Sequence, residues 1–230
     1  MRLSLIGISI SYIYAIYWSL YEGDLISKAL VGLAFPLSMI FAISMHSLPR
    51  TFRSKPHPIA LLSVPLLALG LFDYRFYLMS LIPYLIGSKY FELPRYCKLS
   101  KEIGGIAGKG LFYYCCGHAF SVIALIFPLI FYSTPLTFLH TMLLGFVSIH
   151  VFIHLPTMIP PILGIKNARR YNYFPYVLTI LASALWPFFK DLSWLLYFSA
   201  LIAVALVFLP LNLPKRGTKS ARRAGAGILA

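Results

Sequence analysis

The chain has 230 residues, of which 60% are hydrophobic and only 11% are charged, and its formal net charge is +14. A mean hydropathy of +0.81 is too high for a soluble domain of this size, which indicates a protein that uses lipid as its solvent. The strand-like alternation of apolar and polar residues is missing. The composition therefore favours an all-α integral membrane protein over a β-barrel.

Apolar segments follow one another along the chain, and we interpret them as eight transmembrane helices. They cover residues 3–21, 29–48, 57–72, 76–91, 110–132, 137–158, 172–189 and 192–213. The third and fourth segments are short and meet at a tight polar turn, as do the seventh and eighth, so each pair is alternatively a re-entrant hairpin. The first segment lacks a small-residue cleavage site after it, which predicts an uncleaved helix.

Basic residues are distributed very unevenly between the two sides of this arrangement. If the N-terminus is inside, 17 of the 20 Lys and Arg residues are inside, and only Lys28, Arg75 and Lys190 are outside. The positive-inside rule then predicts eight spans in the cell (cytoplasmic) membrane with both ends cytoplasmic. Because the charge lies between apolar segments, it does not indicate nucleic acid. The expected partners are the lipid bilayer and other membrane subunits.

The two halves of the chain share a pattern. "FAISMHSLPR" closes the second segment and "HVFIHLPTMIP" closes the sixth, and each is followed by a basic loop and a tight two-helix unit. This indicates two parallel four-helix repeats, residues 1–100 and 101–213, with a site expected at their interface. Residues 214–230 are basic and rich in Gly and Ala, which predicts a disordered cytoplasmic tail.

Two local patterns are interpreted without a functional role. The stretch "GGIAGKG" (104–110) lacks the Ser or Thr and the spacing of a phosphate-binding loop, and is predicted to be a flexible connector. The three cysteines, Cys97, Cys115 and Cys116, form neither a disulfide framework nor a CxxC pair. We expect them to be small apolar packing residues.

Histidines are the strongest polar candidates within the apolar segments. The centres of these segments contain no Asp, Glu, Lys or Arg, which argues against carboxylate relays and paired-carboxylate sites. At 1.5 Å per residue, His118 and His150 lie ~13 Å and ~12 Å from the inner surface, on adjacent antiparallel helices. His154 follows His150 by four residues and shares its face. Neutral imidazole is the least costly titratable group to bury, and it binds metals.

The other histidines differ in depth. His46 ends the second segment at a height similar to that of His154, whereas His140 lies near the outer surface and His57 lies in a loop. The separation of His140 and His154 is the one that b-type cytochromes use to hold two haems. A partner helix with two histidines at that spacing is missing, so the pattern favours one haem or one metal. The tyrosines and phenylalanines at helix ends are interpreted as an aromatic belt.

The stretches "LHTMLLGFVSIHVFIHLPTMIPPILG" and "PLSMIFAISMHSLPRTF" resemble the recurring pattern of NnrS-type and haem–copper-oxidase-like membrane proteins. That pattern is a histidine, a Gly-Phe pair and a helix ended by proline, and the resemblance covers about 50 residues. It implies haem b with ligands among His46, His118, His140, His150 and His154. The chain departs from these families in having eight predicted spans where twelve are common, and in lacking a His-His pair for copper.

A second resemblance is to seven-helix membrane zinc hydrolases of the ceramidase and progestin-receptor type. Those proteins use one histidine from an early helix and an H-x-x-x-H pair from a late one, an outline matched by His46, His150 and His154. Three imidazoles with an open fourth position suit a catalytic zinc. The transmembrane aspartate of that family is not matched, because Asp73 is predicted at the opposite membrane face.

The favoured hypothesis is a haem-binding protein in or beside a respiratory electron-transfer chain. His118 and His150 are the predicted axial ligands of the iron, and His46 and His154 are a lower ligand pair or propionate partners. Basic residues at the inner side are candidates to neutralise propionates, namely Arg50, Arg53, Arg169 and Arg170. Candidate acceptors for the imidazole N–H groups are Ser121, Thr141 and the carbonyls freed by Pro156 and Pro160. The alternative is a structural or accessory subunit without a cofactor.

Overall fold

The computed structural model describes residues 9–10, 13–14, 16–18, 20–162 and 171–208, with the side chains of Ile26, His46, Ile106, residues 157–162 and residues 207–208 left out. All regular structure in this part of the chain is helical, which confirms the all-α class. The elements are α2 (Leu25–Thr51), η1 (Pro58–Leu62), α3 (Ser63–Leu69), α4 (Arg75–Gly87), η2 (Tyr90–Glu92), α5 (Leu93–Ile103), α6 (Gly105–Ala124), α7 (Ile126–Ile130), α8 (Pro135–Thr141), η3 (Met142–Val147), α9 (Ser148–Ile162), α10 (Phe174–Leu185) and α11 (Lys190–Phe208).

Three of the described stretches are long and apolar enough to cross a membrane: Ser27–Thr51, Ala107–Ile130 and Pro135–Pro156. They correspond to the second, fifth and sixth predicted segments. Other helices are shorter: α4 has 13 residues and α10 has 12, against the roughly 20 that a bilayer core requires. The eight-span count and the two repeats stay predictions. The tail from residue 214 lies outside the described residues.

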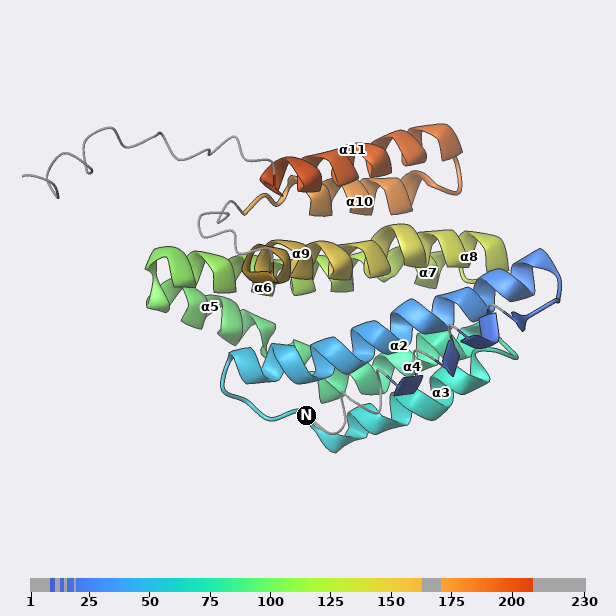
Figure 1. Ribbon diagram of the computed structural model, residues 1–230, viewed down its shortest axis with the longest axis horizontal. Coiled ribbons are helices and arrows are strands. Elements are labelled where there is room, and N and C mark those ends of the chain that lie inside the picture. Colours follow the sequence, from blue (N-terminus) through green and yellow to red (C-terminus); the bar gives the residue numbers. More distant parts are fainter. Residues whose placement is uncertain (1–8, 11–12, 15, 19, 163–170, 209–230) are drawn as a thin grey trace, which may run out of the picture.

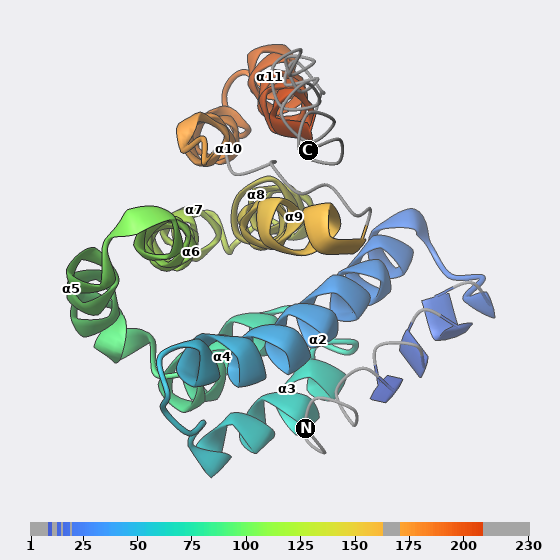
Figure 2. The ribbon, with the colours of Figure 1, turned by 60° about the vertical axis from the view of Figure 1, so that its left-hand side comes forward.

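The helices stack in three layers (Figures 1 and 2). One outer layer is the antiparallel pair of α10 and α11. The middle layer holds α6 and α7 beside α8 and α9, and the other outer layer holds α2, α3 and α4. Helix α5 packs along α6 at one edge. The histidine-bearing helices α6 and α9 therefore lie between the two outer layers.

The third spanning stretch is interrupted by a π-helical segment, η3, where the usual backbone hydrogen-bond ladder is broken. Side chains satisfy two of the carbonyls there. The Ser183 hydroxyl donates to the Thr141 carbonyl at 3.0 Å, and the Ser148 hydroxyl donates to the Leu143 carbonyl at 2.6 Å. Such satisfaction is required in hydrocarbon. This π-helical segment ends three residues before His150. Such segments are frequent at functional sites.

The "GGIAGKG" stretch is not the flexible connector that the sequence predicted. Gly104 and Gly105 adopt φ values of +62° and +58°, which glycine reaches at low cost, and α6 begins at Gly105. Their turn reverses the chain, so that α5 and α6 form an antiparallel hairpin.

This hairpin also corrects the prediction for the cysteines. Cys97 on α5 and Cys115 on α6 form a disulfide, with their Cα atoms 5.7 Å apart. The turn brings the two helices together, which spacing along the sequence does not reveal. Cys116 is a free, half-buried thiol.

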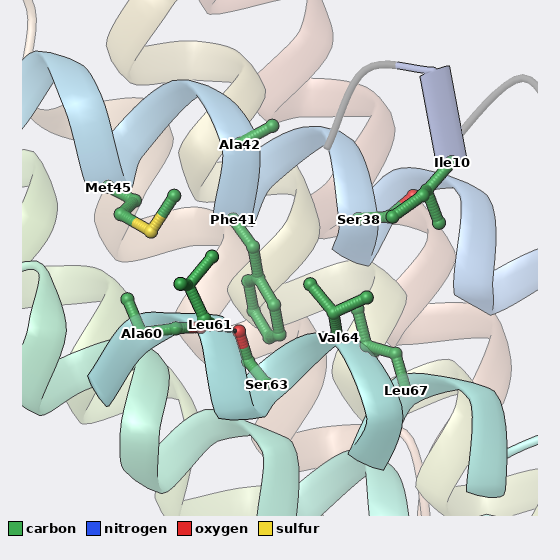
Figure 3. Close-up of a pocket in the computed structure, with 10 residues that line it drawn as sticks. All are labelled: Ile10, Ser38, Phe41, Ala42, Met45, Ala60, Leu61, Ser63, Val64 and Leu67. Atoms are coloured by element: carbon green, nitrogen blue, oxygen red, sulfur yellow. Dashed lines mark hydrogen bonds between the residues drawn. The ribbon is translucent and has the colours of Figure 1, made fainter. Parts of the chain in front are cut away.

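The core between α2 and its neighbours is closely packed. Beneath α2, a hollow of only about 30 Å³ lies among Phe41, Met45, Leu61 and Leu67 (Figure 3). This is about the volume of one water molecule, so it is a packing void with no room for a ligand.

A buried histidine and tyrosine cluster

Three imidazole rings converge between α6 and α9. The ring centroid of His118 lies 5.4 Å from that of His150 and 6.3 Å from that of His154. His118 is 0% exposed and His150 is 1% exposed. The two rings therefore lie close together on the neighbouring helices α6 and α9, as their positions along the chain predicted. A cluster that excludes solvent this completely requires a hydrogen-bond partner for each ring nitrogen.

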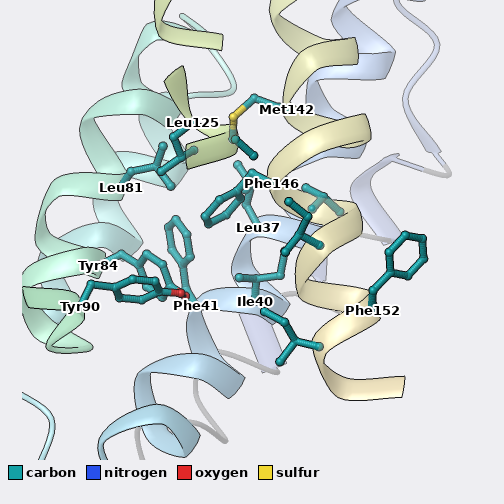
Figure 4. Close-up of a cluster of buried hydrophobic side chains, with 14 of the residues drawn as sticks. Leu37, Ile40, Phe41, Leu81, Tyr84, Tyr90, Leu125, Met142, Phe146 and Phe152 are labelled. Carbon is teal, nitrogen blue, oxygen red and sulfur yellow. The ribbon is translucent and has the colours of Figure 1, made fainter. Parts of the chain in front are cut away.

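Tyrosines from another part of the chain supply partners for two of these nitrogens, His118 Nδ1 and His150 Nε2. The Tyr90 hydroxyl, from η2, lies 2.8 Å from His118 Nδ1 and 3.0 Å from His150 Nε2. The Tyr84 hydroxyl, from α4, lies 2.9 Å from that of Tyr90 and 3.4 Å from His150 Nε2. Figure 4 shows the Tyr84 and Tyr90 side chains next to Phe41, whose ring stacks on Tyr84 at 4.2 Å. The outer layer thus reaches into the middle layer at this point.

The hydrogen-bond geometry assigns the protons of the cluster. His150 Nδ1 lies 2.8 Å from the Phe146 carbonyl, which only accepts, so Nδ1 carries the proton and Nε2 accepts. Tyr90 then donates to His150 Nε2, and Tyr84 donates to the Tyr90 oxygen. That oxygen has a second lone pair, which receives the Nδ1–H of His118. Every short contact is a hydrogen bond in this arrangement.

The reverse arrangement is worse. If Tyr90 donated to His118 Nδ1, the proton of His118 would lie on Nε2, a buried atom without a hydrogen-bond partner among the described residues. Leaving such a donor unsatisfied costs about 1–3 kcal/mol. The contact between the Tyr90 oxygen and His150 Nε2 would then have no proton, because both atoms could only accept. His118 Nε2 therefore holds a bare lone pair inside the bundle.

Aromatic rings enclose the cluster. The Tyr114 ring packs edge-on against His118 at 4.6 Å and against His154 at 5.8 Å. The Tyr114 hydroxyl lies 2.7 Å from that of Ser47 on α2, which ties α6 to the outer layer. Phe146 covers His150 at a centroid distance of 4.3 Å. These contacts hold the imidazoles in fixed orientations.

His140 and His57 lie elsewhere. His140 stacks on Trp186 at 4.0 Å, and its Nδ1 lies 2.8 Å from the Leu136 carbonyl. His57, expected to be an inert loop residue, accepts a hydrogen bond from the Ile59 amide and so caps η1. Neither position brings the imidazole into the cluster.

The predicted propionate partners are not part of the cluster as described. Arg50 is exposed in the last turn of α2, and Arg53 follows it in a left-handed conformation, also exposed. Arg169 and Arg170 lie outside the described residues, as does the side chain of His46. The zinc arrangement that includes His46 is therefore untested.

Two residues predicted to accept the imidazole N–H groups form other hydrogen bonds. Ser121 donates its hydroxyl to the His118 carbonyl at 2.7 Å, and Thr141 donates to the carbonyls of Thr137 and Phe138. Both hydroxyls satisfy their own helix instead of an imidazole, a common use of Ser and Thr in helices.

The described donor set does not form a metal centre of several protein ligands. No group of three His, Cys, Asp or Glu side chains in the described part of the chain could hold a metal ion, and a zinc site needs three or four protein ligands. His118 differs from His150 in having a free lone pair: its Nε2 has no partner among the described residues, and its Nδ1–H is bonded to the Tyr90 oxygen. Both nitrogens of His150 are engaged, and the Tyr90 hydroxyl contacts both rings.

An apolar groove lies beside the cluster. It has a volume of about 420 Å³ and runs between α2 and the η3–α9 stretch. It is lined by Phe35, Pro36, Met39, Ile40, Ile43, Val147, His150, Val151, His154 and Leu155. Two of the stretches long enough to cross a membrane form its walls.

The tyrosines of the cluster were missed because their positions near helix ends suggested the aromatic belt. Tyr84 is 0% exposed and Tyr90 is 6% exposed, so both belong to the core. The one signal in the sequence was the need of buried imidazoles for hydroxyl partners.

No known protein family matches this chain, and neither does any curated protein or solved structure.

Proposed function

We propose that this protein is a multi-pass protein of the cytoplasmic membrane that binds haem b inside its helical bundle. The bare lone pair of His118 Nε2 carries the proposal. Haem iron is held by four nitrogens of its own macrocycle, so one imidazole is sufficient to hold it in the protein. A resident haem would supply one-electron redox chemistry, which suits a role in or beside a respiratory electron-transfer chain.

In this proposal, His118, Tyr90 and His150 have different roles from those that the sequence suggested. His118 is the ligand, and Tyr90 accepts its Nδ1–H, which fixes the ring and raises the basicity of Nε2. His150, the second ligand in the sequence-based hypothesis, instead holds Tyr90 in place by accepting its proton. His118 would thus be the one protein residue to hold the haem, in contrast to the His118 and His150 pair that the sequence suggested.

The experiment is a visible spectrum of the full chain, purified in mild detergent after expression with a haem precursor. We expect a Soret band and a pyridine haemochrome of b type. His118→Gly should remove the band, and added imidazole should restore it, because a free imidazole replaces the missing ligand. His140→Ala, which alters a histidine stacked on Trp186, is the matched control and should keep the band.

Two results would overturn the haem proposal. One is a colourless wild-type protein that takes up no added haemin, and the other is an unchanged spectrum in His118→Gly. A band that persists in His150→Ala, with lower yield, separates the single-ligand arrangement from the bis-histidine one.

A second candidate function is an accessory subunit without a cofactor. The apolar groove between α2 and α9 favours it, because its volume of about 420 Å³ accommodates side chains of a partner helix. A colourless protein that migrates as part of a larger membrane complex in native gels, and loses it in Val151→Trp, supports this alternative.

A further inference from the structure

A basic cavity lies at the turn of the hairpin formed by α5 and α6. Its volume is about 250 Å³. It is lined by Ser100, Lys101, Gly104, Gly105, Gly108, Lys109, Phe112 and Tyr173. A water molecule takes up about 30 Å³, so the cavity has room for a polyatomic group.

The charge in this cavity is uncompensated. Lys101 and Lys109 line it and no acidic residue does. None of the ion pairs among the described residues includes either lysine. The nearest acid along α5, Glu102, is paired with Lys98 at 4.0 Å instead. Two ammonium groups without a counter-charge favour an anion between them.

The shape of the cavity adds to this preference. The Lys101 ammonium lies 5.0 Å from the ring centroid of Phe112, so the side chain is held over the cavity wall. Three glycines also line the cavity, and at Gly108 a Cβ atom would lie 2.5 Å from the Ser100 carbonyl, so α5 and α6 approach closely there. The lining thus combines two lysines, glycine backbone and two aromatic rings.

The location of the cavity indicates the source of the anion. The spanning stretch Ala107–Ile130 begins at this cavity, so the cavity lies where a spanning helix leaves the hydrocarbon. Phosphate groups of lipids lie at that depth, and basic pockets between membrane helices bind anionic headgroups.

We propose that Lys101 and Lys109 form a binding site for a phosphate group, carried by the headgroup of an anionic phospholipid. The lysines bind the phosphate oxygens, and Phe112 and Tyr173 pack against the glycerol and the first acyl carbons. The site is independent of haem binding, because none of its lining residues contacts His118 in the cluster described above.

The test measures lipid binding by native mass spectrometry of the full chain in detergent. The probes are phosphatidylglycerol, phosphatidylcholine of the same chain length, and inorganic phosphate. We expect wild-type protein to bind phosphatidylglycerol in preference to phosphatidylcholine. The double variant K101Q/K109Q should bind phosphatidylglycerol about 30-fold more weakly, and K101R/K109R should restore binding.

Controls separate the site from general charge and from misfolding. Lys98→Gln removes one positive charge from the same helix outside the cavity and should bind like wild type. Displacement of the lipid by millimolar phosphate, with the same lysine dependence, keeps the phosphate site but makes free phosphate the ligand. Equal binding of both lipids, or equal binding by wild type and a folded K101Q/K109Q, overturns the proposal.

Discussion

At the residue scale, the buried cluster depends on one hydroxyl. Tyr90 contacts two imidazoles and a second tyrosine at 2.8, 3.0 and 2.9 Å. It is the only described residue that bonds both His118 and His150. Its position in the short helix η2 makes the cluster a product of two distant parts of the chain.

Tyr90→Phe removes this hydroxyl and keeps the ring. His118 Nδ1 and His150 Nε2 then lose their partner, and each unsatisfied buried group costs about 1–3 kcal/mol. We expect a lower free energy of unfolding by that order, measured by thermal denaturation in detergent, and a weaker or shifted Soret band. Tyr74→Phe, which removes a hydroxyl that donates to the Tyr132 carbonyl, is a tyrosine control outside the cluster. Wild-type stability in Tyr90→Phe would contradict the role of the Tyr90 hydroxyl in satisfying the two imidazoles.

Glu92, two residues beyond Tyr90, gives a pH-dependent contribution to stability. Burial would raise the pKa of its carboxyl, but the hydrogen bond from Lys89 and the charges of Lys89 and Arg95 lower it below its ordinary value. Its carboxylate lies 3.1 Å from Lys89 Nζ and 3.7 Å from Arg95. These pairs hold the start of α5, and with it the position of η2.

A carboxyl whose pKa is lowered by folding stabilises the protein above its unfolded value, near 4.5, and this stabilisation is lost as pH falls through the folded value. Glu92→Gln should therefore be less stable than wild type at neutral pH. The two proteins should converge as pH falls below about 4.5. Thermal unfolding across this range measures the effect, with exposed Glu102→Gln as control. A constant gap at all pH values would show that Glu92 acts through packing alone.

At the element scale, the contact between α6 and α9 determines whether the histidines meet. Gly117 lies next to His118 on α6, and a Cβ atom there would collide with Ile153 Cγ1 on α9 and lie 2.9 Å from the Tyr176 hydroxyl. Small residues allow membrane helices to approach this closely. The close approach at Gly117 is therefore what places the rings of His118 and His150 5.4 Å apart.

Gly117→Ala should separate the two helices. We expect a destabilisation of about 1–3 kcal/mol from overpacking, together with a reduced haem content per protein. Val122→Ala, at a 37% exposed position on the same helix, should change neither quantity. Thermal unfolding and haem quantification are measured on the same samples. A stable Gly117→Ala protein with full haem content would mean that the helix contact is not required.

The hairpin of α5 and α6 is fixed independently by the Cys97–Cys115 disulfide. The bridge spans 18 residues along the chain, and closing a loop of this length in the unfolded state stabilises the fold by about 3 kcal/mol. Cys115 lies three residues before His118, one turn of α6 away. The bridge and the close contact at Gly117 both lie within three residues of His118 on α6.

At the scale of the whole molecule, the number of spans awaits a direct measurement. The eight-span arrangement places the turns at Asp73 and Lys190 outside the cell, whereas re-entrant hairpins place them inside. Reporter fusions at these two positions distinguish the alternatives. We expect external signals at both, because 17 of 20 basic residues then lie inside. Cytoplasmic signals at both positions would reject eight spans and retain the three long stretches.

The sequence alone determined the helical class. Among its eight proposed spans it located the three stretches that are long and apolar enough to cross a membrane, and it placed His118 and His150 at a similar level on neighbouring helices. Hydropathy is a sum over local residues, and depth follows from the constant rise of a helix, so neither requires the tertiary structure. The sequence also indicated imidazole as the strongest polar candidate, because the centres of the apolar segments contain no Asp, Glu, Lys or Arg.

Only the tertiary structure decided the partners of those imidazoles. Tyr90 precedes His118 by 28 residues and His150 by 60, and no periodicity links positions so far apart on different helices. The same holds for the bond between Cys97 and Cys115 and for the close approach at Gly117, both of which depend on how two helices pack. Hydrogen bonds between helices follow from packing geometry, and packing is decided by the whole set of side chains rather than by any one segment.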